Sequence, residues 1–279
     1  MDQWCAYIDE SYDNKTFCVG GFLARATEWT KIERAWEKVI IGERIRSEKK
    51  GFAPISAYHA TDCANLQKEF SAGNGWDINR QIRLTRRLCS VIGSHRLAGF
   101  VIGGSIADVL KHLEPGRDIP KEFLYSVCFK TCLLQIAGWL HAIAIDPQVS
   151  VFYERSEFDK LAREAFDMLK TDSNRVYHSI VSAEPKGWED CIPLQSADFM
   201  AYEGFKCVGS SLKGKSHVRK SLEAIVGSQN EIVIAHFQDQ NFADIMRMIA
   251  NRKEGRPLAE GVNSALRECE GNVPFIPRI

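Results

Sequence analysis

Hydrophobic residues recur along this chain with two periods, one of two residues that is typical of strands and one of three to four that is typical of helices. Short apolar runs bounded by small or turn-forming residues predict five strands, and an alternating run predicts an edge strand. The apolar runs lie at residues 4–10, 17–23, 97–106, 149–153 and 232–236, and the alternating run at residues 177–183. Only Ser11–Lys15 separates the first two runs, so we expect a hairpin there.

Helical spacing appears between these strands. In the first helix, Trp29, Ile32 and Trp36 recur among charged residues, and we expect this helix to pack across the sheet that the hairpin begins. This first helix is predicted at residues 29–47, and further helices at 77–94, 118–143, 158–169, 192–203, through 226 and at 241–251. The helix that starts near Pro120 is apolar on most sides, which predicts a buried central helix.

The predicted helix at residues 77–94 has two contrasting faces. Asp77 suits the N-cap position, where a short polar side chain accepts a backbone hydrogen bond. The side expected to face the core carries Ile78, Ile82, Leu88, Val91 and Ile92, and the outer side carries Arg80, Arg83, Arg86 and Arg87. These arginines could neutralise phosphates, but a solvated helix face is the commoner explanation for such a cluster.

The helix at residues 192–203 differs from the others in its small residues. Pro193 suits the first helical turn. Ser196, Ala197 and Ala201 would let the helix approach a sheet closely, because little side-chain volume separates the two backbones. Between the first and second helices, residues 49–75 are polar and predict a loop that holds Tyr58-His-Ala-Thr-Asp62.

Composition excludes some classes of protein. The 279 residues carry 36 basic and 36 acidic side chains, so no whole-molecule field attracts nucleic acid or an anionic membrane, and any basic surface is local. Nine scattered cysteines, mostly in apolar runs, indicate reduced buried thiols rather than a disulfide framework. The apolar stretch Leu133–Ile145 is too short to span a bilayer. We expect a soluble cytoplasmic protein with no membrane partner.

The length suits one large domain. We expect residues 1–254 to form a single domain with inserted helices. Residues 255–279 contain Pro257, Pro274 and Pro277 with little periodicity, which predicts a loosely held C-terminal tail.

Three carboxylates stand out because of their positions in these elements. Asp9 and Glu154 come at the ends of two apolar strands, and Asp198 lies on the small-residue helix. If they converge at one edge of the sheet, their mutual repulsion raises pKa values, and a divalent cation relieves it. Mg²⁺ or Mn²⁺ prefers such oxygen ligands and keeps coordination positions for a phosphodiester.

Four motifs carry a resemblance to a known family. Tyr7-Ile-Asp-Glu-Ser11, Tyr58-His-Ala-Thr-Asp62, Val151-Phe-Tyr-Glu154 and residues 193–203, Pro-Leu-Gln-Ser-Ala-Asp-Phe-Met-Ala-Tyr-Glu, occur in this order. Together they resemble the domain-of-unknown-function 3800 family, which is similar to the ribonuclease H-like superfamily, over roughly residues 4 to 205. The resemblance implies an α/β fold with a mixed central sheet flanked by helices, and an acidic metal centre at one sheet edge.

The resemblance also implies roles for residues. Asp9, Glu154 and Asp198 match the three family acids, as catalytic residues and metal ligands. The motif positions of less certain role are Glu10, His59, Asp62 and Gln195, of which His59 is a candidate for proton transfer and the others for supporting positions. A familiar ribonuclease H has another acid on its first long helix, and Glu28, Glu33 and Glu37 offer no distinctive match. One metal, two metals, or a site completed by His59 or Asp62 all remain open.

Each candidate also has an ordinary structural explanation. Asp9 and Glu10 suit the opening of a turn, and Glu154 suits an ion pair with Arg155 or a cap on the next helix. Asp198 could lie on a solvated helix face, and a lone histidine in a loop, such as His59, is usually structural. Gln195 could hydrogen-bond the start of its own helix. Glu203, about 140° around that helix from Asp198, is expected outside the site.

A second basic cluster, Lys213, Lys215, Arg219 and Lys220, follows the Asp198 helix closely and is the better candidate for contact with a nucleic-acid backbone. The sequence therefore predicts a hydrolase that uses Mg²⁺ or Mn²⁺ to cleave phosphodiesters in DNA or RNA. Two alternatives stay open: a non-catalytic nucleic-acid- or partner-binding module, which the resemblance loosely places in bacterial defence or mobile-element systems, and a hydrolase of small phosphorylated molecules.

Overall fold

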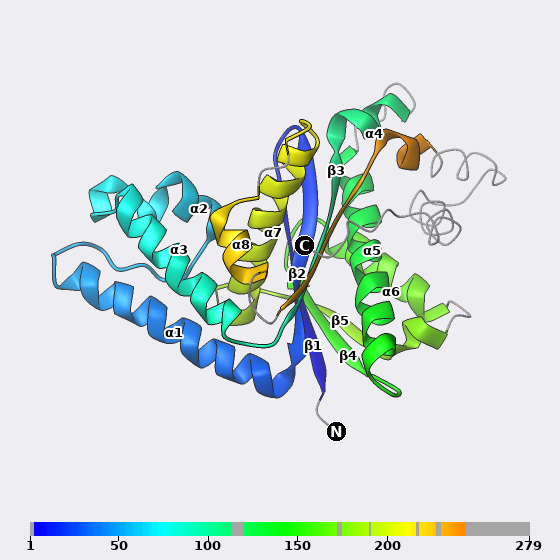
Figure 1. Ribbon diagram of the computed structural model, residues 1–279, viewed down its shortest axis with the longest axis horizontal. Helices are drawn as coiled ribbons and strands as arrows, with labels where there is room; N and C mark the ends of the chain where they lie inside the picture. Colours follow the sequence, from blue (N-terminus) through cyan, green and yellow to red (C-terminus); the bar gives the residue numbers. More distant parts are fainter. Residues whose placement is uncertain are drawn as a thin grey trace.

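A computed structural model describes residues 3–112, 120–171, 175–189, 191–215, 218–226 and 230–243. They form an α/β fold in which helices cover both faces of a six-stranded mixed sheet (Figure 1). The strands lie in the order β5-β4-β1-β2-β3-β6. Their bounds are β1 Trp4–Tyr12, β2 Thr16–Arg25, β3 Ala98–Ser105, β4 Val149–Glu154, β5 Ile180–Lys186 and β6 Glu231–Phe237. Every predicted strand is present, although the edge strand β5 starts three residues late, after the 3₁₀ turn η3 (Arg175–Ser179).

The sheet combines antiparallel and parallel pairs. β1 and β2 form the predicted hairpin, and the Asp13 carboxylate accepts the amide protons of Lys15 and Thr16 in its turn. β2 also pairs antiparallel with β3. β4 lies parallel to both β1 and β5, and β6 lies parallel to β3. Because β1 and β4 run in the same direction, the C-terminal ends of their paired segments lie next to each other.

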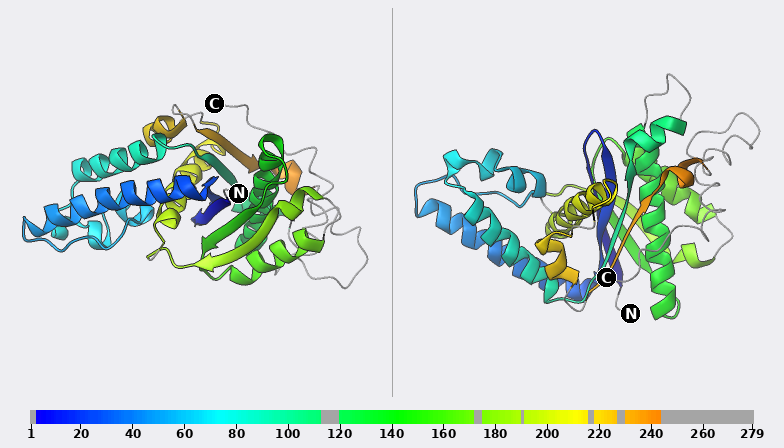
Figure 2. Two further views of the ribbon diagram at one scale, coloured as in Figure 1. Left: turned by 90° about the horizontal axis from the view of Figure 1, so that it is seen from below. Right: turned by 45° about the horizontal axis from the view of Figure 1, so that its top comes forward.

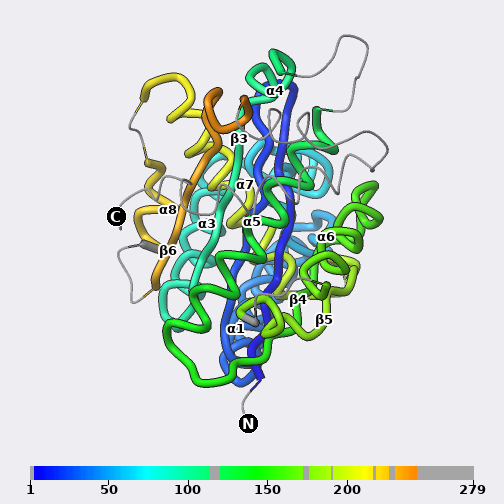
Figure 3. The backbone as a smooth tube through the Cα atoms, turned by 90° about the vertical axis from the view of Figure 1, so that its right-hand side faces the viewer, coloured from blue at the N-terminus to red at the C-terminus, as the bar shows by residue number. Residues whose placement is uncertain are grey.

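One face of the sheet is covered by α5 (Pro120–Ile143) and α6 (Asp159–Thr171), which Figure 3 shows lying in front of the strands. The prediction of a buried central helix is confirmed for α5, which buries apolar residues around its circumference. α5 is also long and apolar enough to cross a bilayer by length and composition, but most of it is buried inside the protein. The short helix α4 (Ile106–His112) follows β3 on this side.

The other face carries α7 (Ile192–Ser211), which lies against β1, β2 and β3. Beyond it are α1 (Ala26–Glu48), α3 (Ile78–Gly93) and α8 (Lys220–Val226). The loop between α1 and α3 contains α2 (Ala60–Asn65), η1 (Lys68–Phe70) and η2 (Ala72–Asn74). Figure 2 shows α1 and α3 side by side, projecting away from the sheet as a helical arm.

The prediction that α1 packs across the sheet is wrong for most of its length. Its start contacts the sheet through Trp29, which donates a hydrogen bond to the Cys5 carbonyl at 2.8 Å and packs edge-on against Tyr7. Further along, α1 packs against α7 and α3 instead. The apolar spacing correctly predicted a buried face, but α7 already covers the centre of the sheet.

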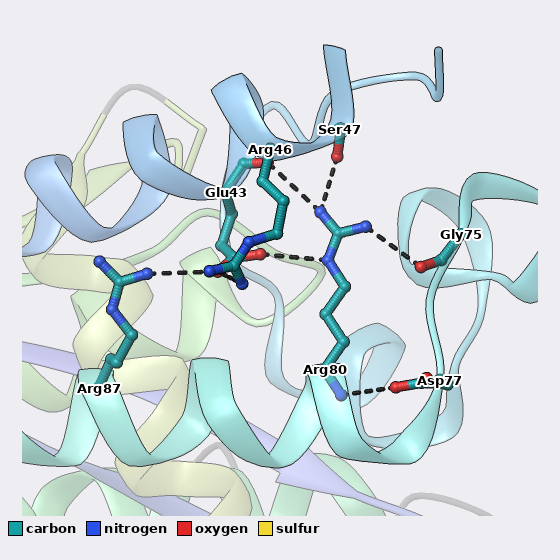
Figure 4. A network of polar contacts seen from close by, with 7 residues as sticks. All are labelled: Glu43, Arg46, Ser47, Gly75, Asp77, Arg80 and Arg87. Atoms are coloured by element: carbon teal, nitrogen blue, oxygen red, sulfur yellow. Dashed lines mark hydrogen bonds and ion pairs between the residues drawn. The ribbon is translucent and has the colours of Figure 1, made fainter. Parts of the chain in front are cut away.

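A buried ion-pair network joins the two helices of the arm, as Figure 4 shows. The Glu43 carboxylate, fully buried, accepts from Arg80 at 3.1 Å, from Arg46 at 2.7 Å and from Arg87 at 3.2 Å. Arg80 also donates to the Ser47 hydroxyl and to two backbone carbonyls. Since all these donors surround one carboxylate, the network fixes α3 against α1.

The predicted faces of α3 are wrong at its start only, since further along the helix Leu88, Val91 and Ile92 are buried and Arg83, Arg86 and Arg87 are exposed as predicted. Asp77 caps the helix as expected, accepting the Arg80 amide proton at 2.6 Å. However, the Arg80 side chain is only 4% exposed, whereas Ile78 and Ile82 are 55% and 37% exposed. The reason is Glu43, which supplies the charge that lets an arginine enter the helix interface.

The close approach of α7 to the sheet is confirmed by two glycines. A Cβ on Gly20 of β2 would lie 3.1 Å from the Ala201 Cα, and one on Gly204 would lie 2.4 Å from a Val101 methyl. Side chains at these positions would push α7 away from the strands. The small residues therefore set how deeply Asp198, on the same helix, reaches toward the sheet.

The eight cysteines in the described residues are free thiols, and five of them are buried, as the sequence predicted. Most of the predicted helix at residues 241–251 and the whole predicted tail at residues 255–279 lie outside the described residues.

Candidate functional site

Asp9 and Glu154 meet on one face of the sheet. In the parallel pair of β1 and β4, Tyr7 lies beside Phe152 and Ile8 beside Tyr153, so Asp9 and Glu154 come next in register. Tyr7 and Phe152 stack on the face that α7 covers, and alternation along each strand puts both acids on that face. The Glu154 carboxyl group is near enough to that of Asp9 to raise its pKa. Neither the turn nor the helix-cap explanation accounts for this arrangement.

Asp198 approaches the same place from α7. Its side chain is 7% exposed, which rules out the solvated-face explanation. The Ala60 amide donates to its Oδ2 at 2.7 Å, so the start of α2 holds one oxygen of the carboxylate. Segments far apart in the sequence therefore place Asp198 and Glu154 near enough to Asp9 to raise its pKa.

Burial and mutual repulsion dominate the electrostatics of this carboxylate cluster (Asp9, Glu154 and Asp198). Burial raises the pKa of Asp9 well above its usual range, and the neighbouring Glu154 and Asp198 raise it further. Burial also raises the pKa of Asp198 to about 6, against the opposing influence of His59 and the Ala60 amide. No arginine or lysine of the described residues forms an ion pair with any of the three. The cluster thus holds more negative charge than its surroundings compensate.

Glu10 faces the opposite side of the sheet. As the neighbour of Asp9 on a strand, it points toward the start of α6, where the Ser156 side chain hydrogen-bonds it. Burial raises its pKa to about 8, and Glu154 and Asp159 act in the same direction. Glu10 is close enough to Glu154 to interact electrostatically but does not share a face with Asp9.

His59 and Asp62 lie at the rim of the cluster. His59 is the N-cap residue of α2, and its Nδ1 accepts the Asp62 amide proton at 3.3 Å, which confirms a structural role. The ring is partly exposed and lies near Trp188. Asp62 is 3.2 Å from His59 and 3.1 Å from Lys68 Nζ. Because Lys68 already compensates its charge, Asp62 is a weaker candidate for holding a cation than the carboxylate cluster.

Gln195 has a role that neither explanation from sequence included. Its Oε1 accepts the indole proton of Trp36 at 3.1 Å and the Tyr58 amide proton at 3.0 Å. One turn further along α7, Asp198 accepts the amide proton of Ala60. Side chains three residues apart on a helix share a face, and alternate amides of an extended segment point the same way, so the two bonds act together. Gln195 therefore fixes the segment that holds Asp198.

The spacing of these residues was the available signal in the sequence. Gln195 and Asp198 are three residues apart, and Tyr58 and Ala60 are two apart, which matches a helix face against an extended segment. Many pairs of residues in the chain share these two spacings. The spacings are therefore informative only once the structure shows that the two segments are in contact.

The remaining acids considered from sequence lie outside the cluster. Glu28 on α1 pairs with Lys31 at 2.9 Å and with His95 at 2.7 Å. Glu203 is 2% exposed and pairs with Arg219 at 3.2 Å, so its predicted exclusion from the site agrees with the structure. Glu33 and Glu37 form no carboxylate contact with Asp9 among the described interactions.

The carboxylate cluster has the chemical groups that bind a divalent cation, but its geometry suits such an ion only in part. Asp9 and Asp198 are buried and Glu154 is half-buried, and carboxylates without a compensating cation are the oxygen ligands that Mg²⁺ and Mn²⁺ prefer. Within the described ranges, however, no three His, Cys, Asp or Glu side chains are arranged closely enough to hold an ion as they stand. Glu154 and Asp198 both raise the pKa of Asp9, and the Ala60 amide holds Asp198 in place.

The predicted nucleic-acid-binding residues separate into two groups. Lys213, Lys215 and Lys220 are exposed. Arg219 is turned toward α7, where it pairs with Glu203, so the prediction of a backbone contact by Arg219 needs revision: its charge is already compensated.

Comparison with protein-family models, curated proteins and solved structures finds no match to this chain.

Proposed function

We propose that this protein is a divalent-metal-dependent nuclease with ribonuclease H-like architecture. The observation that carries the proposal is the meeting of Asp9 and Glu154 on adjacent parallel strands, with Asp198 facing them from α7 and no arginine or lysine of the described residues paired to the cluster. The strand order and mixed pairing of the central sheet support the architecture. Family resemblance in the four sequence motifs supports the assignment to phosphodiester chemistry.

In this proposal Asp9, Glu154 and Asp198 hold Mg²⁺ or Mn²⁺. The cation would supply a water molecule of lowered pKa and would stabilise charge on the phosphate oxygens. The chain's own contribution is position: β1 and β4 fix two carboxylates side by side, and Gln195 with the Ala60 amide fixes the third. His59, partly exposed at the rim, is placed to move a proton to or from solvent.

The test is cleavage of single- and double-stranded DNA, RNA and hybrid duplex in Mg²⁺, Mn²⁺ or chelator. We expect cleavage by the wild-type protein in metal only, and a loss of at least about 100-fold in Asp9→Asn and in Asp198→Asn, since each removes a charged ligand. Glu184→Gln is the matched control, because Glu184 is an exposed acid on the neighbouring strand β5. Undiminished cleavage by Asp9→Asn and Asp198→Asn would refute the mechanism.

One observation favours the alternative of a non-catalytic binding module. Among the described residues, no three His, Cys, Asp or Glu side chains are arranged to hold a metal ion. Under that alternative, wild-type protein binds nucleic acid without cutting it in any metal, and Asp9→Asn binds equally well. The same panel, read for binding as well as cleavage, therefore separates the two functions.

A further inference from the structure

A groove of about 880 Å³ lies between α3 and α8, away from the carboxylate cluster. Figure 1 shows the two helices side by side on the far side of α7 from β1 and β4. Its walls come from residues 81–94 and 219–224, which are more than a hundred positions apart in the sequence. Arg86 of the first basic cluster and Arg219 and Lys220 of the second thus line the same groove.

Most side chains that line the groove carry a hydrogen-bond donor, although Gln81, Ser94 and Ser221 already donate within the protein, and Ile82 and Ala224 add apolar surface. Arg86 and Ser90 on α3 face Lys220 on α8, and all three are exposed. Thr85 and Gln81 add further polar groups. No acidic residue is among the described lining residues. Arginine, lysine, serine, threonine and glutamine are the side chains that donate to phosphate oxygens in nucleic-acid complexes.

Some basic residues of both clusters form ion pairs with buried acids, and others do not. Arg80 and Arg87 are bound by Glu43 in the arm, and Arg219 is bound by Glu203 on α7. These arginines hold the walls in place, and their charges are compensated. Arg86 and Lys220 form no ion pair among the described interactions, so they supply the groove's uncompensated charge.

We propose that this groove binds the sugar–phosphate backbone of a nucleic-acid duplex. The proposal rests on the nuclease function proposed above and names how that function's substrate is held. No aromatic residue is among the described lining residues, so the groove offers no surface on which unstacked bases could lie. A duplex, whose bases stay stacked, needs only donors and cations aimed at its phosphates.

The groove and the carboxylate cluster flank the same helix. Glu203, which holds Arg219 at the groove, is five residues from Asp198, or about 7.5 Å along the axis of α7. Because Glu203 and Asp198 lie about 140° apart around α7, the groove and the carboxylates are on different sides of this helix, and the groove would anchor a duplex away from the site of cleavage.

The test is binding of a fluorescent 20-base-pair DNA duplex by anisotropy, in chelator so that no cleavage is needed. The variant Arg86→Gln/Lys220→Gln removes both uncompensated charges. At 0.1 M salt we expect its affinity to fall by at least about 10-fold, and the slope of log K against log salt to become less negative by about 0.9 per charge removed. The control Lys160→Gln/Lys170→Gln removes two exposed charges from α6, on the opposite face of the sheet, and should bind like wild type.

A second variant tests the groove without removing a cation. Ser90→Glu places a negative charge on an exposed helical position inside the groove, and should weaken duplex binding while leaving the thermal unfolding temperature unchanged. Wild-type affinity and salt slope in both groove variants, or an equal loss in the α6 control, would overturn the proposal.

The experiment also separates this proposal from the nuclease. Groove-dependent binding by a wild-type protein that cleaves nothing would refute the nuclease and keep the groove. Metal-dependent cleavage with an undiminished kcat/KM in both groove variants would keep the nuclease and refute the groove.

Discussion

Replacing Asp198 by asparagine should stabilise the protein when no metal is bound. Asparagine keeps an oxygen that can accept the Ala60 amide proton, which Asp198 accepts at 2.7 Å, but it removes the buried charge. Burial raises the pKa of Asp198 from 3.8 to about 6. A raised pKa means that the folded state binds the proton more tightly than the unfolded state. Protonation of Asp198 therefore stabilises the wild-type protein fully below the unfolded pKa, and this stabilisation is lost as the pH rises through about 6.

The size of the effect follows from the shift. A difference of about two pKa units corresponds to ~3 kcal/mol over the whole titration. Between pH 5 and pH 8 wild type loses only ~1.4 kcal/mol of this stabilisation, because the rest is lost below pH 5, where the unfolded group ionises while the folded group stays mostly protonated. The free energy of unfolding of Asp198→Asn, relative to wild type, should therefore rise by about that amount between these pH values.

The assay is urea unfolding followed by tryptophan fluorescence, in chelator, at pH 5 and pH 8. Glu184→Gln, which removes an exposed acid, should show no pH-dependent change relative to wild type. Adding Mg²⁺ at pH 8 should stabilise wild type and not Asp198→Asn, because a ligand bound only by the folded state raises its stability. A destabilised Asp198→Asn at pH 8, or a difference that does not change with pH, would refute the electrostatic reasoning.

Other substitutions test how the site and the arm are held. Gln195→Leu leaves the amide of Tyr58 without its acceptor, so it should cost about 1–3 kcal/mol in urea unfolding and reduce kcat, whereas Gln195→Glu, which keeps an acceptor, should recover much of the stability. Arg80→Met should cost about 3–5 kcal/mol, because Glu43 would stay buried with a main partner removed, and Glu43→Leu/Arg80→Met should lose less than Arg80→Met alone; equal losses in the two proteins would contradict the pairing. Ala201→Leu should lower the unfolding temperature by several degrees, since α7 lies 3.1 Å from the Cβ position of Gly20, and an unchanged temperature would contradict the close approach.

Much of the fold could be predicted from local patterns. The strands that carry Asp9 and Glu154 are short apolar runs with turn residues beside them, and such runs need little tertiary information to identify. The buried position of Asp198 was also indicated, because Ala197 and Met200 surround it with apolar volume. The convergence of the three acids followed from strand ends and helix position together.

What the sequence could not predict depends on which helix faces which. Ile78 and Ile82 have the spacing of a core face, yet they are exposed, because the partner that α3 meets is Glu43 rather than an apolar surface. The same holds for Arg219, whose compensating acid lies on another helix. Periodicity identifies faces of different polarity, but the neighbour across an interface decides which face is buried.

The central claim is that Asp9, Glu154 and Asp198 bind a divalent cation together. The most direct measurement is titration of Mn²⁺ into the protein, followed by the loss of the free-ion signal in electron paramagnetic resonance. Wild type should take up Mn²⁺ and release it to excess Mg²⁺, and Asp9→Asn should take up far less, while Glu184→Gln binds like wild type. Equal uptake by wild type and Asp9→Asn, or no uptake by wild type, would contradict the account.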